Sequence, residues 1–206
     1  GVMVKNFLDE VWRLEPGRPS EQFYDAWAET YDEDLAEVGY VAPMRCAQAL
    51  AAAATARDRA ILDLGCGTGL SGVALRAVGF TLIDGWDPSA EMLRHAEARN
   101  AYRVLRQIEP DRPLTGAIGV YAAIVAAGAI CPGHAPPTAI GECLSLLPKG
   151  GFLVFSLNER ALADGSYIAE TEAAIDAGKA RLVSRTSGPY IETIGMGADI
   201  LVLEKL

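Results

Sequence analysis

The chain of 206 residues lacks any stretch of about 18 apolar residues, the length that a helix needs to cross a bilayer, so no membrane-spanning helix is expected. Its first residues lack the basic-then-apolar order of a signal peptide, and its four cysteines form no Cys-x-x-Cys pair. Reduced thiols and a cytoplasmic location are therefore expected. Cys131 and His134 stand close together in the sequence, but a structural zinc needs about four ligands, so no metal site is expected.

Basic residues are also scarce. Lysine and arginine number 18 against 27 acidic residues, which gives a net charge of −9. The basic residues form no cluster, whereas a surface that binds duplex nucleic acid needs many cations to displace counterions. We expect neither nucleic acid nor a membrane as a partner, and a small molecule as substrate; nothing in the sequence indicates an oligomeric state.

What the chain does have is apolar sequence: 50% of its residues are hydrophobic and 22% are charged, enough for a folded core. From residue 60 onward, short apolar segments alternate with helical patterns. Strands are expected at residues 60–64, 81–86, 102–107, 121–127 and 152–157, and helices at 70–78, 89–100 and 137–147. Strands that are apolar on both faces and alternate with helices predict a parallel sheet with helices on both sides.

The carboxyl-terminal part departs from this alternation. A helix is expected at 166–179, followed by strands at 181–186 and 198–204. Because the Gly-rich connection between these two strands is short, they are expected to pair as an antiparallel hairpin.

Two helical patterns precede the first strand, one from residue 21 and one from near residue 43. The chain has no internal repeat and no long linker. We therefore expect one domain, with residues 1–58 as an amino-terminal helical cap segment and residues 59–206 as the α/β core.

The stretch ILDLGCGTGL, residues 61–70, places Gly65, Gly67 and Gly69 directly after the first strand. A phosphate-binding loop needs Lys and then Ser or Thr after its last glycine, and here Leu-Ser follows. A dinucleotide fingerprint needs a third glycine inside the helix, and Gly72 supplies one out of register. The spacing alone excludes the phosphate loop and leaves a dinucleotide open.

Two acidic residues narrow the choice of ligand. Asp63, at the end of the first strand, is expected to face the ligand crevice, where a carboxylate repels pyrophosphate but suits an ammonium or sulfonium group; it alternatively caps local backbone amides. Asp87 ends the second strand, where an acid commonly accepts hydrogen bonds from ribose hydroxyls. The alternative for Asp87 is helix N-capping, with Pro88 at the first helical position.

Several segments together resemble a known family. LDLGCGTG, DGWDPSAEML and LPKGGFLVFS resemble the class I S-adenosylmethionine-dependent methyltransferases, and FYDAWAETYDEDL matches a helix found in a subset of them. DRPL and AGAICPGHAPPTAI are similar to the Williams–Beuren-region methyltransferase-like proteins. The resemblance covers roughly residues 20–204 and implies a Rossmann-like, doubly wound, mostly parallel seven-stranded sheet with amino-terminal helices and a carboxyl-terminal antiparallel hairpin. It also implies methyl transfer from S-adenosylmethionine, with S-adenosylhomocysteine as product, to an acceptor that no motif identifies.

The resemblance also implies which residues bind the cofactor. They are Asp63, Gly65, Cys66, Gly67, Thr68 and Gly69 in and before the loop, Asp87, Pro88, Ser89, Met92, Glu109 and Ala127 in later segments, and Tyr24, Trp27 and Tyr31 in the upstream helix. The upstream aromatics would cover the cofactor, with ordinary core packing as the alternative. Glu109, with Asp111 close by, stands where family members carry an aspartate that contacts the adenine amine. Ala122 replaces an acid that is frequent at the start of the fourth strand.

One residue is a candidate for catalysis. His134 follows the fourth strand at the carboxyl edge of the sheet, where a general base would help an oxygen or nitrogen nucleophile. The alternative is that His134 orders a Pro-rich loop. Two other functions stay open: a binding module that holds S-adenosylmethionine without transferring the methyl group, and an NAD-dependent oxidoreductase.

Overall fold

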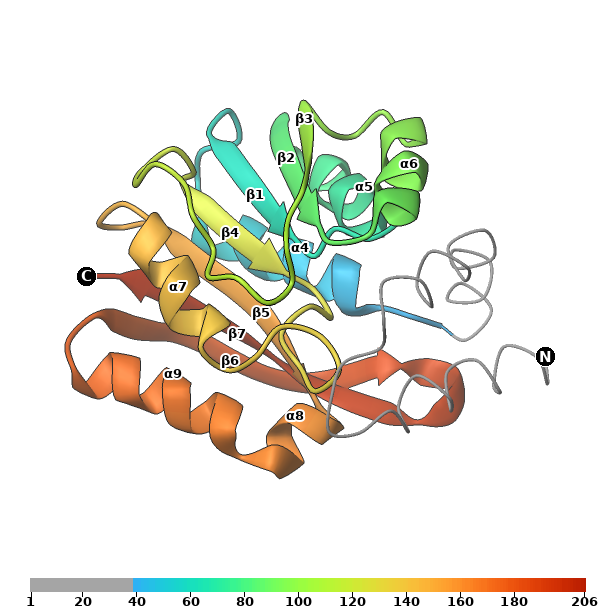
Figure 1. Cartoon of the computed structure of the whole chain (residues 1–206). Helices are drawn as coiled ribbons and strands as arrows, with labels where there is room; N and C mark the ends of the chain where they lie inside the picture. Colours follow the sequence, from blue (N-terminus) through green and yellow to red (C-terminus); the bar gives the residue numbers. More distant parts are fainter. Residues whose placement is uncertain (1–38) are drawn as a thin grey trace.

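The structure, a computed structural model, describes residues 39–206; the predicted helix from residue 21, with Tyr24, Trp27 and Tyr31, lies outside the described residues. Within this range the chain forms a seven-stranded sheet in the order β3-β2-β1-β4-β5-β7-β6, which runs through the middle of the molecule (Figure 1). The strands are β1 (Ala60–Leu64), β2 (Leu82–Asp87), β3 (Val104–Gln107), β4 (Ala123–Ala126), β5 (Phe152–Asn158), β6 (Ala180–Ile191) and β7 (Met196–Lys205).

Strands β1 to β5 run parallel, while β7 pairs antiparallel with β5 and β6 pairs antiparallel with β7. The chain proceeds outward from β1 to β3 and then returns to β4 on the other side of β1. This reversal of strand order creates a crevice outside the carboxyl ends of β1 and β4, the place where open α/β sheets bind ligands. The predicted α/β fold, with seven strands, a mostly parallel sheet and an antiparallel hairpin at its end, is confirmed.

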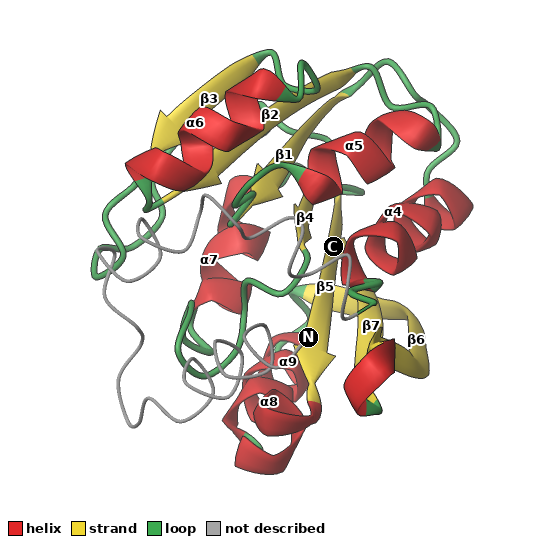
Figure 2. Ribbon diagram, turned by 90° about the vertical axis from the view of Figure 1, so that its right-hand side faces the viewer, coloured by secondary structure: helices red, strands yellow, loops and turns green. Residues whose placement is uncertain are grey.

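Helices cover both faces of the sheet, because successive strand residues point to opposite sides and both sides are apolar. Leu50 of α4 (Ala42–Ala53) and Leu75 of α5 (Leu70–Ala77) pack on one face. Ile140 of α7 (Ala139–Leu146) and Tyr167 of α9 (Ser166–Asp176) pack on the other. Helix α6 (Ala90–Ala98) packs on β2 and β3, and α8 (Glu159–Asp164) follows β5 (Figure 2). None of the helices in residues 39–206 combines the length and apolarity that a bilayer crossing requires.

The terminal hairpin is longer than its sequence pattern predicts. Strand β6 continues through Gly188 and Pro189, residues that indicate a turn, and a short 3₁₀ segment (Glu192–Ile194) makes the connection to β7. The guanidinium of Arg45 in α4 donates hydrogen bonds of 2.8 to 2.9 Å to the carbonyls of Thr186, Pro189 and Ala198. A Cβ atom at position 188 would lie 2.9 Å from that guanidinium, so glycine allows Arg45 to reach the strand. Arg45 thus ties helix α4 to both strands of the hairpin.

Candidate functional site

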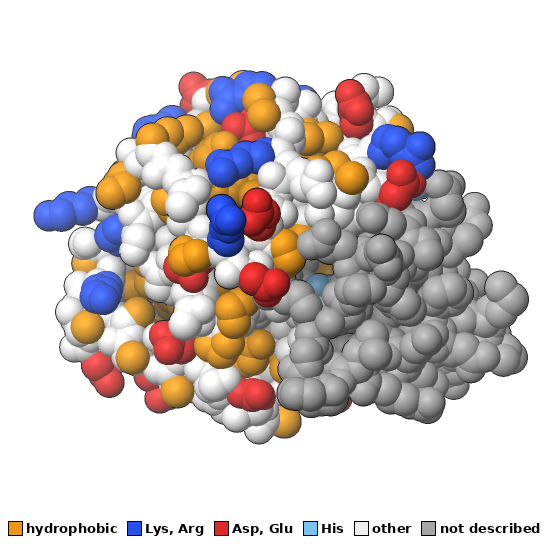
Figure 3. All heavy atoms as spheres, viewed as in Figure 1, with side chains coloured by type: hydrophobic (Ala, Val, Ile, Leu, Met, Phe, Trp, Pro, Cys, Tyr) orange, Lys and Arg blue, Asp and Glu red, His pale blue; other side chains and the backbone are white. Residues whose placement is uncertain are grey.

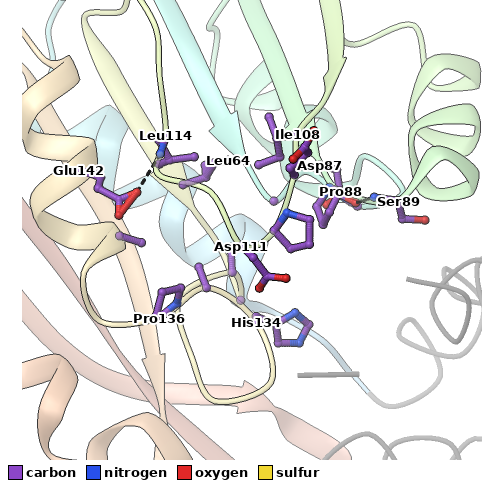
Figure 4. A pocket seen from close by; sticks show the side chains of 18 of the residues that line it. Leu64, Asp87, Pro88, Ser89, Ile108, Asp111, Leu114, His134, Pro136 and Glu142 are labelled. Atoms are coloured by element: carbon purple, nitrogen blue, oxygen red, sulfur yellow. Dashed lines mark hydrogen bonds between the residues drawn. The ribbon is translucent and has the colours of Figure 1, made fainter. Parts of the chain in front are cut away.

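A cavity of about 650 Å³ opens at the carboxyl edge of the parallel strands (Figure 4), within the size range of small-molecule sites. The loops after β1, β2, β3 and β4 and the first turn of α7 form its walls. The cavity brings together nine of the residues that the sequence singled out, namely Gly65, Gly67, Asp87, Pro88, Ser89, Met92, Glu109, Ala127 and His134. Asp63, Cys66, Thr68 and Gly69 do not line it.

The glycine loop is folded back against the end of β2. The backbone N–H groups of Gly65 and Cys66 both donate to the carbonyl of Trp86, at 2.7 and 3.1 Å. A Cβ at Gly65 would lie 2.5 Å from the Cβ of Ala129, so this glycine lets the loops after β1 and β4 approach each other. Gly67 has a φ of +54°, and no atom of residues 39–206 lies within 4 Å of its absent Cβ. Its backbone therefore borders open space on the cavity side, as a close backbone approach to a ligand requires.

Asp87 is held at the cavity wall by two backbone hydrogen bonds. Its Oδ1 accepts from Gly67 N and its Oδ2 from Ser89 N, both at 3.0 Å, and the residue is only 7% exposed. The N-cap of α6 is Ser89, whose hydroxyl accepts from Met92 N, so the alternative role of Asp87 as the helix cap is wrong. Each carboxylate oxygen can accept more than one hydrogen bond. The two backbone hydrogen bonds thus fix the carboxylate at the cavity wall.

Asp63 is placed differently from the prediction. Its carboxylate is completely buried, accepts from the Ser71 hydroxyl at 2.8 and 3.0 Å, and accepts from the Tyr102 hydroxyl at 2.6 Å. Asp63 therefore faces the space between β1, α5 and Tyr102 rather than the crevice, and its partners are side-chain hydroxyls rather than the backbone amides of the alternative. Burial raises the pKa of Asp63 to about 7, against the hydrogen bonds from Tyr102 and Ser71, which lower it.

The raised pKa of Asp63 makes stability depend on pH. Between about pH 4 and pH 7 the folded chain holds a proton that the unfolded chain releases, so this carboxyl stabilises the fold at low pH and loses that contribution as pH rises toward 7. Asp63→Asn keeps an acceptor oxygen and removes the titration. We expect the free energy of unfolding of the variant, relative to wild type, to rise by about 3 kcal/mol from pH 5 to pH 8. Urea unfolding of wild type and variant at both pH values measures this change. If the two proteins differ in unfolding free energy by the same amount at both pH values, the raised pKa of Asp63 is contradicted.

The other residues of the glycine loop, Cys66, Thr68 and Gly69, are buried in the protein. Cys66 and Thr68 are 4% and 1% exposed, and an added Cβ at Gly69 would lie 3.2 Å from the Cα of Ala96 in α6. Because alternate loop residues face opposite sides, Gly65 and Gly67 border the cavity while Cys66 and Thr68 pack against the protein. These buried residues shape the loop.

Gly72, which stood out of register for a dinucleotide fingerprint, has a packing role. Its N–H donates to the Tyr102 hydroxyl at 3.0 Å, and an added Cβ would lie 2.3 Å from Cζ of the same ring. Tyr102 therefore bridges the first turn of α5 and the buried Asp63 carboxylate. The network holds the helix that follows the glycine loop against β1.

Alanine at position 72 is expected to destabilise the fold by about 1–3 kcal/mol, because the ring of Tyr102 must move to admit the methyl group. Gly141 in α7 is a matched control, since it is also helical and none of the residues that the structure describes lies within 4 Å of its absent Cβ. Gly141→Ala is expected to be neutral or to stabilise by up to about 1 kcal/mol through helix propensity. Chemical denaturation compares the two variants; equal effects would contradict the close packing at Gly72.

His134 lies in the turn after β4, and its backbone N–H donates to the carbonyl of Cys131 at 3.0 Å. Figure 4 shows its imidazole on the same side of the cavity as the carboxylate of Asp111. Cys131 is completely buried, and burial raises the pKa of its thiol to about 12, so it is not a nucleophile at neutral pH. Among residues 39–206 no group of three or more histidine, cysteine or acidic residues is arranged to hold a metal ion.

Glu109, which the resemblance places beside the adenine amine, lies in an exposed part of the cavity lining. The side chain of Glu109 is 67% exposed and forms an ion pair of 2.7 Å with Arg112, three residues further along the loop after β3. Asp111 also lines the cavity. Both acids are thus available at the cavity mouth, at the position where the resemblance implies contact with the adenine amine.

Tyr40 and Glu142 are among the cavity residues that the sequence analysis did not single out. Tyr40 lines the cavity and packs edge-to-face on Tyr190, with ring centroids 5.3 Å apart, and Gly128 lacks the Cβ that would meet the Tyr40 hydroxyl at 2.2 Å. Glu142 projects from the first turn of α7. One sequence feature could have identified Glu142: it is an acid at the start of the helix that follows a central strand. No sequence feature indicates Tyr40 as a cavity residue.

Comparison with known proteins agrees with this geometry. Residues 40–188 match the family model of a methyltransferase domain. The chain is 34% identical over 157 residues to human methyltransferase-like protein 27, a match that covers 75% of this chain and 63% of the relative, so the chain spans less than two thirds of that protein.

Two solved structures share the fold. The [4+2]-cyclase SpnF has a TM-score of 0.67 and 18% identity, covering 92% of this chain and 97% of its own. A TehB-like S-adenosylmethionine-dependent methyltransferase from Corynebacterium glutamicum has a TM-score of 0.61 and 20% identity, covering 88% of this chain and 99% of its own. The sequence matches and the shared fold together confirm the resemblance that the motifs indicate. This chain belongs to the class I S-adenosylmethionine-dependent methyltransferases.

Proposed function

We propose that this chain binds S-adenosylmethionine in the cavity and transfers its methyl group to a small-molecule acceptor. The observation that carries the proposal is the Asp87 carboxylate, fixed at the cavity wall by Gly67 N and Ser89 N. A carboxylate in this place suits the two hydroxyls of a ribose. The open space beside Gly67 and the apolar side chains of Met92 and Ile108 in the same wall suit the rest of a nucleoside.

The protein's own part in such a reaction is mainly alignment. When bound, S-adenosylmethionine supplies a methyl group on a positively charged sulfur, and the methyl–sulfur bond breaks as the bond to the acceptor forms. Asp87 and the glycine loop would hold the nucleoside, and the cavity walls would limit access of water to the reacting atoms. His134 would accept the proton that an oxygen or nitrogen nucleophile releases.

Two further parts of the proposal are a small-molecule acceptor, supported by the charge of the protein, and a cytoplasmic location, supported by its thiols. On the face in Figure 3, basic side chains are scattered among acidic and apolar ones, and the net charge is −9; both support a small molecule over nucleic acid. All four cysteines are buried and free, which supports a cytoplasmic location.

Isothermal titration calorimetry with S-adenosylhomocysteine tests the cofactor, with NADH as the comparison ligand. We expect S-adenosylhomocysteine to bind and NADH not to bind; the opposite result would support an oxidoreductase. Labelled S-adenosylmethionine, incubated with a panel of amines, alcohols, thiols and acids, then tests methyl transfer.

A second candidate function is that of a module that binds S-adenosylmethionine without transferring its methyl group, and one comparison favours it. SpnF shares the fold at a TM-score of 0.67 and is named as a cyclase, so the fold also accommodates a reaction other than methyl transfer. This candidate predicts binding of S-adenosylhomocysteine without label transfer to any member of the panel. Label transfer to an acceptor would exclude it.

A further inference from the structure

The cavity extends beyond the residues that would hold a nucleoside. Its far wall, here called the acceptor wall, consists of Leu114 from the loop after β3 together with Ala135, Pro136, Ala139 and Glu142 from the loop after β4 and the start of α7. In Figure 4 Glu142 and Leu114 lie on the opposite side of the cavity from Asp87 and Pro88. Four of its five members are apolar, so the wall suits the carbon skeleton of a small molecule.

Glu142 is the polar group of this wall, and its carboxylate is held in position. Its Oε1 accepts from Leu114 N at 2.9 Å, a contact that joins α7 to the loop after β3 (Figure 4). Its Oε2 accepts no hydrogen bond from the described residues. Glu142 is half-buried, and a carboxylate that is partly removed from water gains from a donor or a cation that pairs with it.

Acidic residues outnumber lysine and arginine among the described residues that line the cavity. Asp87, Glu109, Asp111 and Glu142 line it, whereas Arg112 is its one guanidinium or ammonium group among the described residues. Arg112 is 76% exposed and already pairs with Glu109. Among the described residues an acceptor with a carboxylate or phosphate would therefore meet four acids and one cation that is already paired, whereas a cationic acceptor would be attracted.

We propose that the methyl acceptor is a small, largely apolar molecule that carries an amine, protonated when it binds, and that this ammonium group pairs with Glu142 while the carbon skeleton packs on the acceptor wall. The ammonium has no lone pair and serves only to bind, so the methyl group goes to another oxygen or nitrogen of the acceptor, which gives up its proton to His134. This inference rests on the proposed function, since it assigns the second substrate of the same cavity. The ammonium donates to Oε2, the oxygen that the Leu114 contact leaves available.

Three probes with one carbon skeleton and different head groups test the inference: phenethylamine, phenethyl alcohol and phenylacetate. Each is titrated by calorimetry into protein saturated with S-adenosylhomocysteine. We expect the amine to bind about tenfold more tightly than the alcohol, because the ammonium adds an ion pair to the hydrogen bond that either head group donates to the carboxylate, and phenylacetate to bind more weakly than both. Equal binding of phenylacetate and the amine would overturn the inference.

Glu142→Gln keeps an oxygen for Leu114 N and removes the charge. In this variant we expect the preference for the amine over the alcohol to fall to about twofold or less, with the affinity for S-adenosylhomocysteine unchanged. Glu170→Gln, an exposed change on α9, is the matched control and should keep the preference. A preference that survives in Glu142→Gln, or binding of none of the probes while S-adenosylhomocysteine still binds, would overturn the inference and leave the proposed function intact. Failure of S-adenosylhomocysteine to bind wild type would instead overturn the proposed function.

Discussion

Asp87→Asn is expected to weaken the binding of S-adenosylhomocysteine by about a hundredfold, the equivalent of about 2.7 kcal/mol. In wild type, both oxygens of Asp87 accept from the backbone, Oδ1 from Gly67 and Oδ2 from Ser89. Two ribose hydroxyls would add two further donors. The amide of asparagine has one acceptor oxygen and no charge, so it cannot serve the backbone and the ribose together.

A control separates this effect from loss of structure. Glu97 is an exposed acid on α6, the helix that follows Asp87, and Glu97→Gln should leave the affinity for S-adenosylhomocysteine unchanged. Calorimetry gives the affinity of each variant, and thermal unfolding without ligand gives its stability. If Asp87→Asn lowers stability but binds S-adenosylhomocysteine as wild type does, then Asp87 only fastens the loop and the ribose assignment is wrong.

Asp87 also illustrates what the sequence could predict. Its place depends on local features: an apolar strand, an acid at its end, and a serine that caps the next helix. The central strands can also be predicted from local sequence, since apolar residues must face both covering layers in a parallel sheet. Local pattern therefore predicts the crevice and the residues at the ends of the strands that form it.

The orientation of Asp63 could not be predicted in this way. The sequence places it correctly at the end of β1, but its direction is decided by the Tyr102 hydroxyl, which comes from the segment before β3. The ring of Tyr102 fits only because Gly72 and Gly85 lack side chains, with added Cβ atoms 2.3 and 2.9 Å from it. Such a contact joins segments far apart in the chain, and no periodicity or motif indicates it.

Helix α8 and the extension of β6 show two other limits. The sequence does carry local signals for α8: Asn158 accepts from Ala161 N as its N-cap, and Gly165 ends it with a φ of +82°. The helix is too short for an apolar period to be visible. The extension of β6 has no local signal, because Gly188 and Pro189 favour a turn; pairing with β7 and the hydrogen bonds from Arg45 keep this segment extended.

The second large effect is expected at His134. With an acceptor found in the labelled-cofactor panel, His134→Gln should lower kcat by about a hundredfold, the lower end of what a positioned general base contributes. The affinity for S-adenosylhomocysteine should stay unchanged, because the residue belongs to the loop after β4 rather than to the glycine loop or the end of β2. Steady-state kinetics and calorimetry measure the two quantities separately.

The control for His134 is the other of the two histidines, His95 in α6, which does not line the cavity. His95→Gln should keep kcat within about threefold, since a substitution outside the cavity removes no group from the reacting atoms. The pH dependence adds a readout that a structural role would not give: protonation of a catalytic imidazole slows the reaction in acid, and the variant should lack this fall. If His134→Gln keeps the wild-type kcat and pH profile, then His134 serves the fold of its Pro-rich loop, and the acceptor must lose its proton to water or to a neighbouring carboxylate such as Asp111.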